Sequence, residues 1–120
     1  SAGMAYLQLN KYKEAVTHLD KFSSSDPILS ALALGNIGDA FVALNQPNDA
    51  LDYYKKAIDK SDNALTAPIY LNKAAQVAQD QKNYKEALTY LERIKSDYPK
   101  SEEAASVDVQ ISQVQALMNL

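Results

Sequence analysis

The chain has 120 residues, with 12 Lys and Arg against 15 Asp and Glu, and a formal net charge of −3. This length fits one domain, and 47% hydrophobic with 22% charged residues is typical of folded chains rather than disordered ones. The acidic excess argues against nucleic-acid binding, because contacts with phosphates need a cationic face. The absence of Cys excludes disulfides, thiolate metal sites and cysteine nucleophiles. No apolar run approaches the length of a membrane span, so we expect no direct membrane contact.

A short motif recurs three times, at intervals in the mid thirties of residues. Each copy ends in an alanine, and a large apolar residue follows that alanine one helical turn later. A small residue precedes each alanine by about three turns, where it would let two helices approach closely. The alanines are Ala15, Ala50 and Ala87, and the earlier small residues are Gly3, Gly38 and Ala75.

This pattern resembles the tetratricopeptide repeat, a helix–turn–helix unit of about 34 residues. The most complete copy consists of Leu34, Ile37, Gly38 and Phe41, followed by Ala50, Tyr54 and Ala57. The resemblance implies an all-α fold, an α-solenoid of antiparallel helix hairpins with a partial repeat at 1–26 and repeats at 27–62 and 63–99. Because the copy around Gly3 lacks its upstream apolar anchor, we expect the sequence to be a piece of a longer protein.

Capping residues support the same division without the family. Asp26 before Pro27 predicts the start of one helix, and Thr66 before Pro68 predicts another. Residues 100–120 are predicted to form one amphipathic helix that covers the open end of the stack, with a partner-binding or dimerising helix as the alternative. Ser101 would cap this helix, and its apolar stripe is Ala104, Val107, Ile111, Val114 and Met118.

The residues that chemistry would need are scarce. His18 is the single His and has no partner at metal-ligand spacing. Pairs such as Asp49 and Asp52 lie near predicted helix ends, where the helix dipole and solvent account for them. We therefore expect no enzyme activity, no metal and no cofactor.

The resemblance also implies a binding surface, since the first helices of such repeats line the concave side of a right-handed superhelix. Asn and Gln side chains both donate and accept hydrogen bonds, so they suit the backbone of a bound peptide, although they also suit a merely solvated helix face. The candidate partner-binding groove residues are Asn36, Asp39, Asn72, Lys73, Gln76 and Gln79, and the same helical phase adds Met4, Leu7 and Ala43. We expect a non-enzymatic scaffold that binds a peptide or a partner protein. The alternative is a structural spacer that self-associates, as a homodimer, within a longer membrane-anchored protein.

The segment Ser96–Ala104, with Tyr98-Pro99 before Ser101, is similar to junctions between repeats in tetratricopeptide scaffolds of the bacterial cell envelope. This resemblance implies an envelope or periplasmic location with an anchor upstream of the present sequence. A cytoplasmic location is the alternative.

Overall fold

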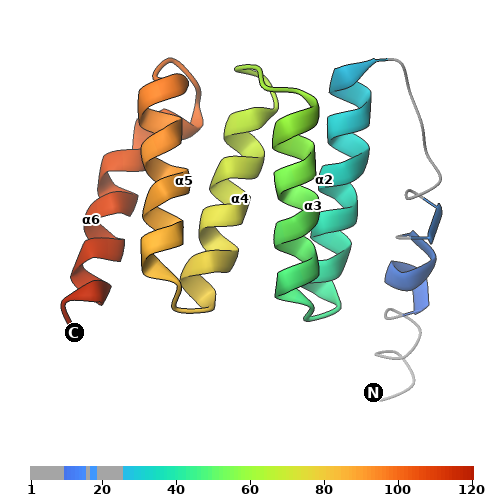
Figure 1. The fold of residues 1–120 in the computed structure, drawn as a ribbon, viewed down its shortest axis with the longest axis horizontal. Helices are drawn as coiled ribbons and strands as arrows, with labels where there is room; N and C mark the ends of the chain where they lie inside the picture. The colour runs from blue at the N-terminus through green and yellow to red at the C-terminus, as the bar shows by residue number, and fades with distance from the viewer. Residues whose placement is uncertain (1–9, 16, 19–25) are drawn as a thin grey trace.

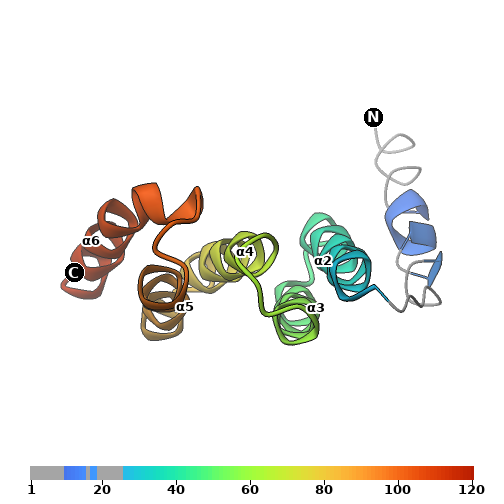
Figure 2. The ribbon, with the colours of Figure 1, turned by 90° about the horizontal axis from the view of Figure 1, so that it is seen from above.

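The computed structural model describes residues 10–15, 17–18 and 26–120, and all regular elements in this part of the chain are helical. Sequential helices stand side by side and alternate in direction (Figure 1). Seen from above, α2, α4 and α6 form one layer, and α3 and α5 form the other (Figure 2). The elements are α2 (Pro27–Ala43), α3 (Pro47–Lys60), α4 (Ala67–Asp80), α5 (Tyr84–Asp97), the 3-10 helix η1 (Glu103–Ser106) and α6 (Val107–Met118).

This arrangement confirms the predicted all-α solenoid of helix hairpins. One pair of helices, α2 and α3, lies within 27–62, and the next, α4 and α5, lies within 63–99. The division between repeat units at these residues stays a prediction. The partial repeat at 1–26 lies mostly outside the described residues. Within it, residues 10–15 and 17–18 are described and are helical.

Asp26 begins α2 as the sequence predicts. Its backbone is extended, and its Oδ1 accepts hydrogen bonds from the backbone N–H groups of Ile28 at 2.9 Å and Leu29 at 3.5 Å. Pro27 follows at the first helical position, where its missing N–H leaves no intrahelical bond unmade.

The helix predicted to begin after Thr66 does begin there, but the prediction that the Thr66 side chain caps it is wrong. Thr66 precedes α4, but its side chain makes no capping bond, and its Oγ1 donates instead to the carbonyl of Ser61 at 3.2 Å. The backbone N–H groups of Leu65 and Thr66 are bound by Asn63 Oδ1, at 2.8 and 2.9 Å. Because the turn at Asn63 precedes it, Thr66 already has helical backbone dihedral angles. A residue whose side chain caps a helix has an extended backbone instead.

The single helix predicted after residue 100 is also corrected, because η1 and α6 divide it at Ser106. Ser101 does bind the start of this segment, since its Oγ accepts from the N–H of Ala104 in η1 at 3.2 Å, but the N-cap position of η1 is Glu102. The tighter winding of a 3-10 turn changes the phase of the apolar stripe. Val107 and Val114 are buried, whereas Met118 is 47% exposed.

The core runs through α3, α4, α5 and α6 as one apolar cluster. The repeat alanines Ala50 and Ala87 are fully buried within it, with Leu91 and Ile94 of α5 beside them. Two aromatic residues of neighbouring hairpins stack across the layers, because the Tyr54 and Tyr70 rings have centroids 6.1 Å apart at an angle of 17°. Each ring lies against a glycine of α2, Tyr54 against Gly38 and Tyr70 against Gly35. The small residue predicted at Gly38 therefore has the expected role, whereas the contact of Gly35 was not predicted.

Candidate functional site

The six predicted groove residues all lie on α2 and α4, in the layer that also contains α6 (Figure 2). We use the term first-helix face for this set together with Gln110 of α6. Its members are Asn36, Asp39, Asn72, Lys73, Gln76, Gln79 and Gln110. Of the positions added by helical phase, Ala43 is exposed at the end of α2, and Met4 and Leu7 lie outside the described residues.

Asp39 joins the two hairpins at this face. Lys73 Nζ of α4 donates to both of its carboxylate oxygens, at 2.9 and 3.0 Å. Tyr54 of α3 donates from its hydroxyl to Asp39 Oδ1 at 2.6 Å. Burial raises the pKa of Tyr54 well above its usual value, and the hydrogen bond to Asp39 and the negative charge of that carboxylate raise it further. One carboxylate therefore fixes the spacing of three successive helices.

Asn72 is engaged by the last helix. Gln110 Nε2 of α6 donates to Asn72 Oδ1 at 2.9 Å. This bond connects α6 to α4 as the Lys73–Asp39 ion pair connects α4 to α2. Gln110 was not predicted, because its helix was expected to cap the end of the stack. Its position about one repeat length after Lys73 is the signal that would have found it.

The other three predicted residues take no part in these bridges. Asn36 and Gln76 are exposed and Gln79 is half-buried. Within the described residues, none of these three side chains has a hydrogen-bonding partner. The face thus presents open amide groups beside charges that neutralise each other.

Two hollows lie near the turns between helices. A pocket of about 190 Å³ lies where α2 and α4 end. We call it the helix-end pocket, and it is lined by Val42, Asn45, Pro47, Val77, Asp80 and Gln81.

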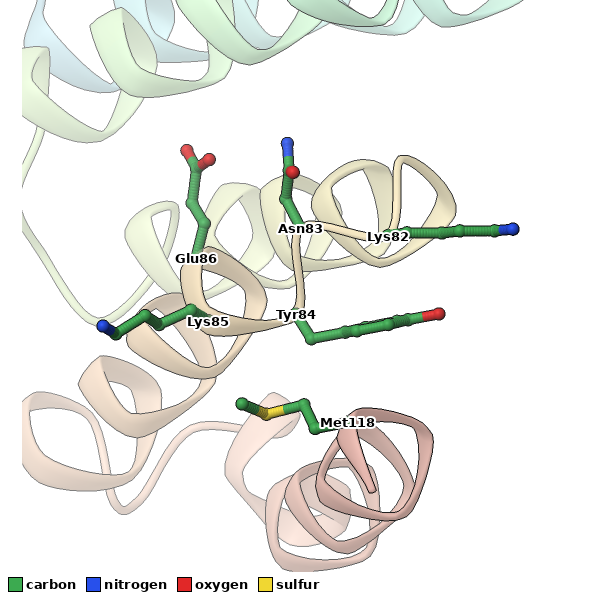
Figure 3. A pocket seen from close by; sticks show the side chains of 6 residues that line it. All are labelled: Lys82, Asn83, Tyr84, Lys85, Glu86 and Met118. Atoms are coloured by element: carbon green, nitrogen blue, oxygen red, sulfur yellow. The ribbon is translucent and has the colours of Figure 1, made fainter. Parts of the chain in front are cut away.

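The second hollow, of about 570 Å³, is a wide, open one between the start of α5 and the end of α6 (Figure 3). Met118 lies beside Tyr84 there, and Lys82 extends in the same direction as Tyr84 (Figure 3). Glu86 points away from Met118 (Figure 3). Its carboxylate pairs with Lys55 of α3 at 3.4 Å.

Among the described residues, no three His, Cys, Asp or Glu side chains come together as metal ligands. None of the helices in the same part of the chain combines the length and the apolar character needed to cross a membrane. His18 is exposed on a helical segment.

The helix hairpins of this chain have relatives among known proteins. The tetratricopeptide repeat profile matches residues 1–64 and again residues 36–102. The chain belongs to the tetratricopeptide repeat family. A mouse tetratricopeptide repeat protein 23-like is 33% identical over an alignment of 110 residues, and the match covers 76% of this chain. The chain spans 24% of the length of that relative.

Two buried tyrosines and one half-buried tyrosine predict that this tetratricopeptide domain loses stability in alkali. Burial first, and then bonds or charges of nearby carboxylates, raise the pKa of Tyr54, Tyr70 and Tyr90 above 10.0. Above pH 10 the unfolded chain loses these protons and the folded chain keeps them, so the free energy of unfolding falls as pH rises. Urea unfolding at about pH 9 and about pH 11 measures this fall. Tyr54→Phe should make the fall smaller, and a midpoint that does not move between the two pH values would contradict the assignment.

Proposed function

We propose that this chain is a protein–protein interaction module that binds an extended or helical segment of a partner along the first-helix face. Tetratricopeptide repeats are in general such modules, and the chain belongs to that family. The observation that carries the proposal is the set of open amides, Asn36, Gln76 and Gln79, on consecutive first helices. Amide side chains can pair with both the N–H and the C=O groups of a peptide backbone.

The bridges across this face support the proposal, because they order it before a ligand arrives. Asp39 and Lys73 fix α2 against α4, and Asn72 and Gln110 fix α4 against α6. Binding then needs little further ordering of the protein, which lowers its entropic cost. Since Asp39 and Lys73 neutralise each other, backbone recognition rather than charge would dominate at the centre of the face.

The proposal is tested by peptides selected from a random display library on the intact chain. We expect Gln76→Ala with Gln79→Ala to weaken the selected peptides about tenfold, since two lost hydrogen bonds are together worth about 1.4 kcal/mol. Fluorescence polarisation measures the affinity, and thermal unfolding checks that the fold is retained. Gln115→Ala changes an exposed amide elsewhere on α6 and should leave binding unchanged. Equal affinity of the folded double variant and the parent would contradict the assignment of the face.

Self-association is the second candidate, and the outer part of α6 supports it. Val109 is 62% exposed and Met118 and Leu120 are exposed as well, so apolar surface remains open at this end of the described helices. As a spacer in a longer envelope protein, the chain would then pair through α6. Sedimentation velocity across a wide concentration range should show a dimer that Val109→Lys disrupts. A monomer at every concentration would exclude this role.

A further inference from the structure

The helix-end pocket offers a specific contact that the amide face does not. We propose that it binds the side chain of a Lys or Arg residue of the partner segment, an inference that rests on the proposed function. The aliphatic stem would lie on the apolar wall of the pocket, and the cationic head would pair with Asp80 at its rim.

The size and lining of the pocket match one long side chain. Its volume of about 190 Å³ is that of about six water molecules and lies below the range of small-molecule sites. Val42, Pro47 and Val77 supply apolar wall for a methylene stem. Asn45 and Gln81 add neutral polar groups, and Gln81 Nε2 donates to Asn48 Oδ1 at 2.9 Å, which ties the α4–α5 turn to the start of α3.

The charge of the pocket is negative and unbalanced. Asp80 is exposed, and within the described residues its carboxylate has no hydrogen bond or ion pair. By contrast, Asp39 and Asp108 are paired with lysines, at 2.9 and 2.8 Å. None of the described residues that line the pocket is a Lys or an Arg. A cation from outside would therefore meet an uncompensated carboxylate.

The helix dipoles add to this negative potential. The pocket lies at the C-terminal ends of α2 and α4, which are the partially negative ends of the helix dipoles. Carbonyl groups of both last turns, such as those of Val42 and Gln79, already accept N–H groups of the following turns, so the helix ends contribute a potential and not free acceptors. Neither helix has a basic residue in its last turn, whereas α3 and α5 have Lys60 and Lys95 there. The positive end of α3 also adjoins the pocket at Pro47, but Asp49 in the first turn of α3 offsets it. The last turns of α2 and α4, which border the pocket, thus have no cationic side chain, whereas the last turns of α3 and α5 each have one.

The pocket can be tested without any peptide, by titrating n-butylammonium into the intact chain and following backbone amide shifts by NMR. We expect saturating shifts at Val42, Asn45 and Asp80, and binding about three- to fivefold weaker for the neutral 1-butanol. Asp80→Asn should remove this difference. Asp59→Asn is the matched control, because it makes the same charge change on an exposed position of α3. Equal binding of the amine and the alcohol to the parent would overturn the inference.

A second test uses peptides selected on the parent chain, and it distinguishes failure of this inference from failure of the proposed function. We expect them to share one Lys or Arg position, and to bind Asp80→Asn about three- to fivefold more weakly. Peptides that depend on Gln76 but have no cationic position would overturn the pocket and leave the proposed function standing. If no peptide binds the folded chain, the proposed function fails, and the amine titration still decides whether the pocket prefers a cation.

Discussion

Gly35→Ala should lower the free energy of unfolding by about 3 kcal/mol, the upper end of the usual cost of overpacking. A Cβ atom at this position would overlap the ring of Tyr70, which is only 3% exposed and therefore surrounded by other atoms of the core. The loss would occur although Ala is favoured over Gly within a helix by about 1 kcal/mol. Helix propensity therefore predicts that Gly35→Ala raises the free energy of unfolding, whereas packing predicts that it lowers it. A lower value would identify the contact between Gly35 and Tyr70.

Urea unfolding of a double-mutant cycle measures this contact. In a Tyr70→Ala background the overlapping ring is absent, and Gly35→Ala should then be neutral or stabilising. Gly38→Ala provides a second case, since its Cβ would lie 2.5 Å from Tyr54 Cε1. A Gly35→Ala variant as stable as the parent would show that α2 and Tyr70 are not packed as described.

Gly35 and Gly38 also show how much of the fold the sequence could predict. Gly38 was predicted because small residues recur at its position in the other copies of the motif. The contact of Gly35 depends on Tyr70 of the next hairpin and has no repeated counterpart, so periodicity could not identify it. The order of the hairpins and the all-helical fold follow from the local apolar pattern and from the spacing of the repeated motif. Contacts between hairpins depend on how one hairpin is rotated onto the next.

The same distinction applies to the candidate site. Helical phase predicted that Asp39, Asn72 and Lys73 line one groove, and the structure shows that their helices, α2 and α4, lie in one layer. Phase could not show that Lys73 pairs with Asp39, because that contact joins residues 34 positions apart across two hairpins. Nor could it show that Gln110 binds Asn72, because the division of η1 from α6 changes which side chains of α6 face α4. Half of the predicted set thus serves to hold the face together.

Asp39→Ala is expected to have the other large effect, a loss of about 2 kcal/mol in the free energy of unfolding. The main cause is the Tyr54 hydroxyl, which would lose a charged acceptor in a position closed to most solvent. A hydrogen bond to a charged group is worth about 1.5–3 kcal/mol, whereas a partly exposed ion pair adds about 0.2–1 kcal/mol. The Asp39–Lys73 pair belongs to the second kind, because both side chains are about two-fifths exposed.

Tyr54→Phe and Lys73→Met separate these two contributions in urea unfolding. In the Tyr54→Phe background, Asp39→Ala should cost less than about 1 kcal/mol, because only the ion pair is then lost. In the Lys73→Met background, Asp39→Ala should still cost more than about 1.5 kcal/mol. Equal costs in both backgrounds would contradict the dominance of the tyrosine bond.

Since Asp39 also fixes the spacing of α2 and α4, Asp39→Ala should weaken the binding of selected peptides even where Asp39 does not touch them. Asp39→Asn, which keeps an acceptor for Tyr54, should restore part of both the stability and the affinity.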